Sequence, residues 1–328
     1  MRARFILNPQ ARQGSASLRE AVGFFVEAGW TVDLQRTEYP GHAIELARCA
    51  ATEGYNLVVA CGGDGTLNEA VNGLAGSATA LGVLPLGTAN VWAREIGLPL
   101  RLADAARALL DGEVHRVDLG YTEPLDGTAP GRGRYFLMMA GIGFDAAVTR
   151  AVRPQEKRRW GMIAYVAAGI ATALRFTGTR MMFQFDGQRI RRRILLAVIG
   201  NTRLYGGLVE ITHQALADDG MLDLCLFEGS GLLQKIEHVV RVLLRRHTAS
   251  PRVRYFRVRE VVVRSRQPVP VQLDGDAYGQ TPMRFRAVPQ ALSVLVPRTY
   301  PRTLFSRQQE PIAVAAAVPG VPLKEVVP

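Results

Sequence analysis

A glycine-rich turn between a strand and a helix constrains this chain more than any other part of its sequence. Residues 61–69 read CGGDGTLNE; they follow the apolar run 55–60, which predicts a buried strand, and precede apolar residues at helical spacing. Glycine lets a ligand approach the main chain, and a helix N-terminus offers unpaired N–H groups to an anion. The three glycines therefore favour a phosphate site, which Asp64 would fit through a divalent metal. The alternative is a sharp turn in which Asp64 caps the helix.

The N-terminal part of the chain alternates short apolar runs with segments of helical spacing. Strands are predicted at residues 4–7, 30–34, 57–60 and 81–84. Helices are predicted at residues 18–26, 43–51, 67–74, 88–96 and 103–110. This order predicts a parallel sheet with helices on both faces, in which ligands bind at the carboxyl ends of the strands. Four polar or glycine-rich turns should therefore meet at one edge: Asn8, Thr37, residues 62–66 and residues 85–90.

The rest of the chain changes to short strands separated by turns such as Asp186-Gly187 and Asp274-Gly275. Strands are predicted at residues 180–186, 189–200, 222–227, 252–256, 260–265, 269–273, 283–287 and 291–296. This pattern predicts an antiparallel sandwich or a curved sheet. An amphipathic helix is predicted at residues 231–247 and a largely apolar one at residues 160–176, and the chain after Tyr300 is expected to be a mobile tail.

The chain carries a formal net charge of +11, with 40 basic and 29 acidic residues. Such an excess favours an anionic partner. Arginine clusters at residues 150–159, 189–193, 241–246 and 252–266. Nucleic acid is not expected as that partner, because neither zinc-finger spacing nor an RNP aromatic motif accompanies the clusters. Two interpretations remain open, a solvated basic face and docking on an acidic membrane surface.

The cysteines and the N-terminus indicate a cytoplasmic protein. The chain has an odd number of cysteines without metal-ligand spacing, Cys49, Cys61 and Cys225, which is typical of reduced core residues. The first residues lead directly into a strand-like segment, so no secretion signal is expected. The longest uncharged stretch, residues 161–174, is shorter than the roughly 20 apolar residues that cross a bilayer.

Further motifs accompany the glycine-rich turn. Asn8-Pro9 closes the first strand and a Gly14-Ser15 turn follows it. Residues 82–99 read GVLPLGTANVWAREIGLP, residues 205–224 read YGGLVEITHQALADDGMLDL and residues 273–276 read LDGD. In this order the chain resembles the diacylglycerol kinase catalytic-domain family, in particular its soluble bacterial lipid kinases. The resemblance covers roughly residues 1 to 300.

This resemblance implies a two-domain lipid kinase, α/β followed by β. An ATP-binding α/β domain of the NAD-kinase and diacylglycerol-kinase type would span residues 1–120 and be completed by residues 297–305. A β-sandwich-like lipid-substrate domain would span residues 121–296, and residues 306–328 would be the mobile tail. Such kinases bind their substrates in the cleft between the domains. They transfer the γ-phosphoryl group of ATP to a lipid hydroxyl, of diacylglycerol or a related lipid, and require Mg²⁺.

The matching motifs carry over site residues one by one. The nucleotide would contact Asn8, Thr37, Gly62, Gly63, Asp64, Gly65, Thr66, Leu67, Asn68, Glu69, Thr88 and Asn90, together with the turn at residues 10–14. Asn68 and Glu69 would orient this network or cap the helix. The family pattern gives a Mg²⁺ site made of the Asp219 carboxylate and the backbone carbonyls of Leu216 and Met221. Oxygen ligands of this kind suit Mg²⁺, whereas the alternative is a simple turn before the next strand.

The resemblance also implies the catalytic carboxylates. Asp276 matches the family's general base, where glutamate is common, and Asp274 beside it is an alternative. Asp64 would belong to an acidic network that extends to Asp118. Many members carry an aspartate where this chain has Val91, so the network lacks one member.

The partners expected on this basis are a lipid substrate at an anionic membrane surface and no nucleic acid. The protein would be cytoplasmic and peripherally membrane-associated, with the apolar segment 160–176 either a part of the lipid path or an ordinary buried helix. Edge strands of the β-rich half could pair two copies into a homodimer. The alternatives are an NAD-kinase-like enzyme, since GGDG followed by NE also occurs in that related family, and a non-catalytic lipid- or nucleotide-binding regulator.

Overall fold

The computed structural model describes residues 1–11, 15–125, 133–143, 177–207, 209–306 and 312–313. The segment 160–176, the basic residues at 150–159 and most of the predicted tail lie outside these ranges. The chain forms two units. Unit 1 contains Met1–Val117 and Ala291–Arg302, and unit 2 contains Asp118–Gln290 and Thr303–Ser306. Two strands, β5 and β17, continue from one unit into the other.

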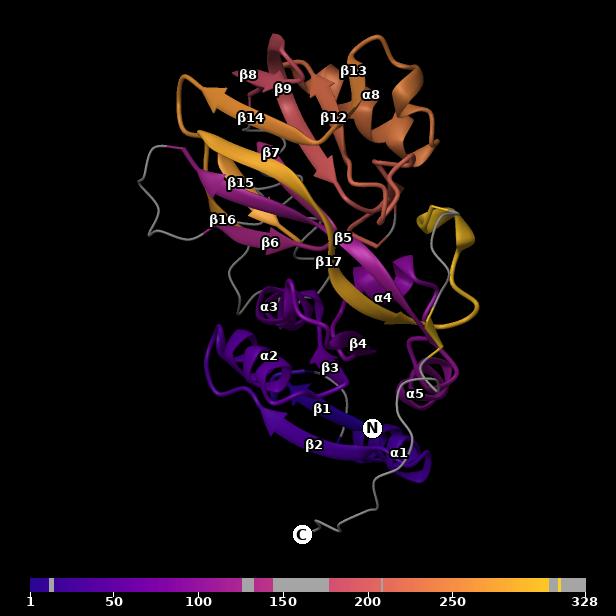
Figure 1. The fold of residues 1–328 in the computed structure, drawn as a ribbon. Coiled ribbons are helices and arrows are strands. Elements are labelled where there is room, and N and C mark those ends of the chain that lie inside the picture. The colour runs from indigo at the N-terminus through magenta and orange to yellow at the C-terminus, as the bar shows by residue number, and fades with distance from the viewer. Residues whose placement is uncertain (12–14, 126–132, 144–176, 208, 307–311, 314–328) are drawn as a thin grey trace. The chain divides into compact units, whose positions relative to one another are not determined.

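The sheet of unit 1 is parallel and has the order β17–β4–β3–β1–β2 (Figure 1). Its strands are β1 (Arg2–Leu7), β2 (Thr31–Arg36), β3 (Leu57–Gly62), β4 (Ala80–Pro85) and the end of β17 (Met283–Val296). Every residue of β3 and β4 is buried, as expected for continuous apolar runs in the centre of a sheet that is covered on both faces. The predicted parallel α/β fold of this part of the chain is confirmed.

The helices of unit 1 are α1 (Ser15–Glu27), α2 (His42–Thr52), α3 (Asp64–Leu74), α4 (Val91–Glu95) and α5 (Leu102–Leu110). Figure 1 shows α2 beside α3, and α1 packs against α5. Right-handed crossovers in a sheet of this strand order place the two pairs on opposite faces. Helix α4 is shorter than the predicted segment 88–96, because Asn90 has a left-handed backbone with φ of 47° and ends the preceding turn.

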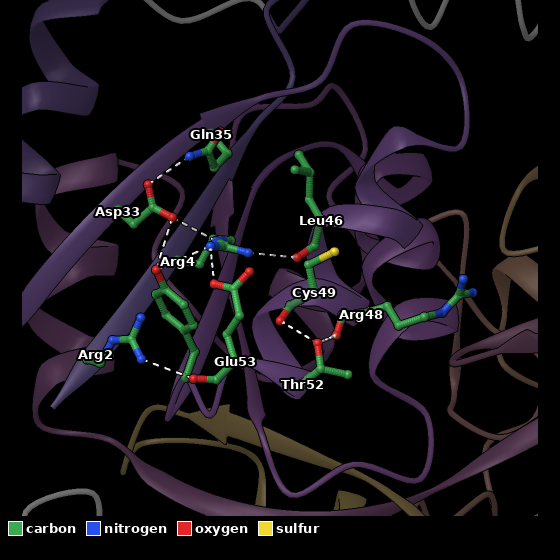
Figure 2. A network of polar contacts seen from close by, with 10 residues as sticks. Arg2, Arg4, Asp33, Gln35, Leu46, Arg48, Cys49, Thr52 and Glu53 are labelled. Carbon is green, nitrogen blue, oxygen red and sulfur yellow. Dashed lines mark hydrogen bonds and ion pairs between the residues drawn. The ribbon is translucent and has the colours of Figure 1, made fainter.

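A buried guanidinium ties β1, β2 and α2 together (Figure 2). Arg4 is 7% exposed, and its Nε and Nη2 lie 2.8 Å from the carboxylates of Asp33 and Glu53 respectively. The hydroxyl of Tyr55 donates to Asp33 at 3.1 Å, and Gln35 donates to the other oxygen of Asp33 at 2.9 Å. The buried charge is therefore compensated by carboxylates and hydrogen bonds, as stability requires.

Unit 2 is an antiparallel sheet with the order β16–β15–β7–β9–β8–β14–β17, in which β12 also pairs with β9 and β13 with β12. Its strands are β5 (Glu113–Pro124), β6 (Arg134–Phe136), β7 (Met139–Gly143), β8 (Thr179–Phe185), β9 (Gln188–Gly200), β10 (Leu204–Tyr205), β11 (Val209–Glu210), β12 (Leu222–Glu228), β13 (Val253–Val258), β14 (Glu260–Ser265), β15 (Pro270–Leu273) and β16 (Asp276–Gln280). Helix α8 (Leu232–Leu243) and two short 3₁₀ helices, η1 (His247–Ala249) and η2 (Arg302–Leu304), complete the described helices. The core is apolar and includes Phe183, Phe285, Val261 and Leu224. The predicted β-sandwich-like second fold is confirmed.

The end of the chain differs from the prediction in three places. Residues 283–287 and 291–296 form the single strand β17, which changes partner from β14 to β4 near Gln290, where φ is 49°. The buried run 291–296 groups with unit 1, although we assigned it to the second domain, because Ser293 and Val294 pair with Ala80 and Leu81 of β4. Residues 303–305, predicted in the first domain, belong to unit 2. Within the predicted tail, β18 (Ile312–Ala313) pairs with β5.

Candidate functional site

The predicted glycine-rich turn joins β3 to α3 directly. Strand β3 ends at Gly62 and the helix begins at Asp64, three residues earlier than its apolar spacing predicted. A β-carbon on Gly62 would lie 2.4 Å from Oγ1 of Thr66, so only glycine fits there. The first backbone bond of the turn runs from Leu67 N to Gly63 O at 3.1 Å. The N–H groups before Leu67 have no intrahelical acceptor, which is the arrangement that binds anions at helix N-termini.

A second turn, between β4 and α4, lies against the first one. A β-carbon on Gly63 would lie 3.2 Å from the Cα of Gly87, so the two backbones are in direct contact. Asn90 closes this second turn, since its side chain accepts from Gly87 N and donates to Gly87 O, both at 2.9 Å. The Asp64 carboxylate then accepts from the N–H of Val91 at 2.8 Å and caps α4. Asp64 thus joins the two turns, and Val91, buried at the start of α4, contributes its main chain to this contact.

The ends of β1 and β2 reach the same edge. Asn8 donates its main-chain N–H to Cys61 O at 3.0 Å, and its side-chain amide donates to Thr66 Oγ1 at 3.2 Å. Thr37 N donates to Leu7 O at 2.9 Å. The prediction that four turns meet at the carboxyl edge of the sheet is therefore confirmed.

Not every residue expected beside the nucleotide lies in this cluster. Leu67 and Asn68 are each 1% exposed, and Leu67 belongs to the core of the unit. The Glu69 carboxylate accepts from the N–H groups of Gly41 at 2.9 Å and Ala43 at 3.2 Å. It therefore caps α2, the helix before its own, whereas the capping alternative had placed it as a cap of its own helix. Thr88 is exposed at the tip of the second turn.

A group of aspartates gathers in unit 2 around the predicted metal residues. Asp118 is fully buried, and its two carboxylate oxygens accept from Gln290 N at 2.7 Å and Gly220 N at 2.5 Å. Burial raises the pKa of Asp118, the two backbone hydrogen bonds oppose that rise, and the negative charges of Asp219 and Asp218 add to it. Negative charge is concentrated here, which attracts a cation.

The predicted Mg²⁺ donors agree in chemical type with that ion, since they are one carboxylate and two backbone carbonyls. Asp219 is already engaged on both oxygens, because Met221 N donates to Oδ1 at 2.9 Å and Arg257 forms an ion pair with Oδ2. The described residues contain no group of three or more His, Cys, Asp or Glu side chains that could hold a metal ion by themselves. A cation at this site would therefore depend on main-chain oxygens and would compete with Arg257.

The two candidate catalytic carboxylates have different surroundings. Asp274 and Gly275 both have positive φ and form the tight turn between β15 and β16. The Asp274 carboxylate is 7% exposed and accepts from three consecutive N–H groups at 2.8–2.9 Å, those of Leu137, Met138 and Met139. Asp276 begins β16, its side chain is 45% exposed, and its carboxylate lies 4.0 Å from Arg134. Asp274 therefore anchors the loop before β7, and Asp276 is the carboxylate available to a substrate.

Three residues of these sites were not predicted from the sequence. Arg257 and Arg134 become neighbours of Asp219 and Asp276 only in the folded chain, so the local sequence carries no signal for these contacts. Asp223 lies opposite Arg257 on β12. Burial raises the pKa of Asp223 to about 6, while a hydrogen bond from Tyr255 and the charge of Arg257 lower it. The sequence analysis recognised the motif at residues 205–224, which contains Asp223, but the motif does not show that this side chain is buried.

Comparisons with known proteins agree over nearly the whole chain. The family profile described as diacylglycerol kinase catalytic domain matches residues 2–122, and that of the YegS C-terminal NAD kinase beta sandwich-like domain matches residues 138–296. A diacylglycerol kinase of Bacillus subtilis (strain 168) is 29% identical, over 90% of this chain and 97% of its own. A protein of Chromohalobacter salexigens named "Probable lipid kinase YegS-like" is 33% identical, and the match covers 89% of this chain and 92% of that protein. A solved diacylglycerol kinase structure from Bacillus anthracis str. Sterne has a TM-score of 0.70 at 21% identity, covers 90% of this chain and 97% of that one, and shows the fold.

Proposed function

This chain belongs to the lipid kinase family that combines a diacylglycerol kinase catalytic domain with a YegS-type C-terminal domain, and from that premise we propose that it transfers the γ-phosphoryl group of ATP to a hydroxyl of diacylglycerol or a closely related lipid. The observation that carries the proposal is the contact between the Gly63 and Gly87 turns at the N-terminus of α3. Two backbones that meet without side chains let phosphate oxygens approach the main chain at the N-terminus of α3.

In this proposal unit 1 holds the nucleotide. The N–H groups at the start of α3 would face the phosphates, while Asn8 supports the turn by donating a hydrogen bond to Thr66. Phosphoryl transfer depends more on positioning and charge neutralisation than on covalent catalysis by the protein. A rigid turn that is pinned by Asp64 and Asn90 meets the first of these needs.

Asp276 of unit 2 is proposed as the general base. The lipid hydroxyl oxygen forms a bond to the γ-phosphorus, the bond from that phosphorus to the bridging oxygen of ADP breaks, and the hydroxyl proton passes to the Asp276 carboxylate. The Arg134 guanidinium lies 4.0 Å from this carboxylate and would help to hold it in position.

Mg²⁺ is proposed as the metal, held by Asp219 with the carbonyl oxygens of Leu216 and Met221. When bound, it would neutralise negative charge in the region of the phosphates. Asp118 would position this site, because its carboxylate fixes the N–H of Gly220 between Asp219 and Met221.

The acceptor is proposed to lie in an anionic membrane that the protein reaches from the cytoplasm as a peripheral protein. The excess of 40 basic over 29 acidic residues supports attraction to such a surface. Among the described residues, no helix has both the length and the apolar character needed to cross a bilayer. Pairing of two copies through edge strands stays a prediction.

An acceptor assay tests the proposal. Labelled ATP and Mg²⁺ are supplied with diacylglycerol, phosphatidylglycerol, sphingosine, ceramide or NAD, and the labelled product is identified. We expect transfer to diacylglycerol or one of the other lipids, slowed by about 10² or more in Asp276→Asn. Transfer to NAD alone would support the NAD-kinase-like alternative. Transfer to none of the five, with ATP binding unaffected by Asp64→Ala, would support a non-catalytic regulator.

A further inference from the structure

Helix α8 of unit 2 directs its apolar side chains into solvent. Seven large apolar residues recur at helical spacing along and just after it and are all exposed: Leu232, Leu233, Ile236, Val239, Val240, Leu243 and Leu244. Leu233 is 83% exposed and Leu243 66%. Residues three and four apart lie on one face of a helix, so these side chains form a single stripe, called here the α8 stripe. An exposed apolar stripe of this length is typical of an interaction surface.

The polar side of α8 faces the protein. His238 is 6% exposed and hydrogen-bonds through Nε2 to the carbonyl of Glu228 at 2.9 Å. Gln234 accepts from the N–H groups of Ser230 and Gly231 at 2.7 and 3.0 Å. Glu237 forms ion pairs with Arg241 and Arg252. The contacts of His238 with Glu228 and of Glu237 with Arg252 hold the polar side of the helix against neighbouring segments, so the α8 stripe faces outward.

A hollow of about 600 Å³ in the same unit is lined by arginines. The six arginines among its described lining residues lie on β8, β9 and β14 or directly follow β14: Arg180, Arg191, Arg192, Arg193, Arg264 and Arg266. None of the described residues that line this hollow is Asp or Glu. Five of the six form no ion pair with a described carboxylate: Arg180, Arg191, Arg193, Arg264 and Arg266. This group is called here the arginine hollow.

Strand pairing brings these like charges together. Arg180 lies opposite Arg193, and Met182 lies between Arg191 on one neighbouring strand and Arg264 on the other. Like charges opposite one another destabilise a sheet. An anion bound from outside would relieve that repulsion, and a phosphate group suits several guanidinium groups at once.

The arginine hollow and the α8 stripe are structurally linked. Gly229, two residues before the N-cap of α8, donates its N–H to the carbonyl of Arg193 at 2.9 Å. Glu228 pairs with Arg192 at 3.5 Å through its side chain, while its carbonyl accepts from His238 of the helix. One short segment therefore connects the wall of the hollow to the start of the helix.

We propose that unit 2 docks on an anionic phospholipid membrane by inserting the α8 stripe among the acyl chains and binding a lipid phosphate in the arginine hollow. An amphipathic helix with cations at its border is the usual form of an interfacial membrane anchor. Residues 231–252 carry five cations (Lys235, Arg241, Arg245, Arg246 and Arg252) and one carboxylate, Glu237. The inference rests on the proposed function in one respect, since a lipid kinase finds its substrate in a membrane.

A second copy of this chain fits the α8 stripe less well. A two-fold interface brings the same surface of each copy together, so the net positive charge of residues 231–252 in one copy would face that of the other. Opposed like charges weaken such a contact, whereas anionic lipid headgroups complement them.

Vesicle sedimentation without ATP tests the stripe. The wild-type chain and Leu233→Ser/Leu243→Ser are mixed with vesicles of phosphatidylcholine alone or with phosphatidylglycerol. The serine variant should partition at least about tenfold more weakly onto the anionic vesicles, because two exposed leucines no longer leave water. The matched control is Val26→Ser/Leu34→Ser, which changes two exposed apolar residues of unit 1 and should bind as the wild type does.

The arginine hollow is tested by Arg191→Gln/Arg264→Gln. Binding to phosphatidylglycerol vesicles should fall about tenfold while binding to phosphatidylcholine is unchanged, because each arginine near the surface contributes to attraction by anionic lipid. Arg48→Gln/Arg101→Gln in unit 1 removes the same charge from exposed positions and should have a smaller effect.

Two results would overturn the proposal. One is unchanged vesicle binding by Leu233→Ser/Leu243→Ser. The other is a wild-type dimer in light scattering that this variant converts to a monomer, without any vesicle binding by the wild type. Failure of phosphoryl transfer in the acceptor assay contradicts the proposed function alone, since sedimentation needs no ATP. If both proposals hold, the serine variant keeps its rate on short-chain diacylglycerol in micelles and loses rate on vesicles.

Discussion

Gly87 lies against Gly63 so closely that a β-carbon on Gly87 would be 2.5 Å from the Cα of Gly63. The same β-carbon would lie 2.8 Å from Oδ1 of Asn90, the atom that closes the second turn. Two turns that follow the neighbouring strands β3 and β4 are thus packed main chain to main chain. Their relative position is determined by the absence of two side chains, which makes the proposed phosphate site sensitive to a single methyl group.

Gly87→Ala should therefore weaken nucleotide binding. The methyl group must push the two turns apart, which costs about 1–3 kcal/mol and moves the N–H groups of the α3 terminus. Calorimetric titration with a non-hydrolysable ATP analogue measures the effect. Gly23→Ala is the control, since nothing lies within 4 Å of its added β-carbon and the residue is inside α1. Equal affinity in both variants would show that the Gly63–Gly87 contact does not shape the site.

Asp276→Asn should lower the catalytic rate, whereas Asp274→Asn should lower the stability of the fold. Asp276→Asn removes the proposed base from a half-exposed position, so kcat should fall by about 10² or more with an unchanged melting temperature. Asp274→Asn turns an amide NH₂ toward N–H groups that need an acceptor and should cost about 1–3 kcal/mol of stability. Activity assays and thermal unfolding of both variants separate the roles. A stable, inactive Asp274→Asn would contradict this assignment.

Mg²⁺ dependence should respond oppositely to two substitutions at the aspartate cluster. Asp219→Asn should raise the Mg²⁺ concentration for half-maximal activity by about tenfold or more, because the only proposed carboxylate ligand is lost. Arg257→Gln should lower that concentration, since it removes the cation now paired with Asp219. Arg254→Gln is a matched control on the same strand, because Arg254 pairs with Glu228 instead. Chelation by EDTA should abolish activity, and added Mg²⁺ should restore it.

Acid should destabilise unit 1 through Asp33. Burial alone would raise the pKa of this carboxyl, but hydrogen bonds from Arg4, Gln35 and Tyr55 outweigh burial and lower it. A carboxyl with a lowered folded-state pKa contributes stability that is complete above its unfolded pKa, about 3.9, and is lost as pH falls through the folded value. Unfolding free energy should therefore fall below about pH 4. Asp33→Asn should flatten this fall in denaturant titrations, and Asp111→Asn, an exposed control, should not.

The local patterns of the sequence predicted most elements because their causes are local. Apolar runs gave β3 and β4, helical spacing gave α2 and α5, and the alternation of both predicted a parallel sheet whose ends share one edge. The start of α3 was placed late, because Asp64 and Gly65 are helical without an apolar side chain to mark them. The prediction divided β17 into two strands on either side of Pro289. The single strand could not be recognised, since its change of partner near Gln290 has no signature in composition.

The glycine-rich turn, its position after a buried strand and the type of chemistry it favours were determined by the sequence alone, because glycine content and hydrophobic spacing act within a few residues. Tertiary structure decided what each polar group does. Glu69 caps α2, Asp274 holds a loop, and Asp276 remains accessible, although the sequence presents all three as comparable carboxylates. The physical reason is that a carboxylate acts through the donors around it, and here those donors come from segments as far as 137 residues away in the chain.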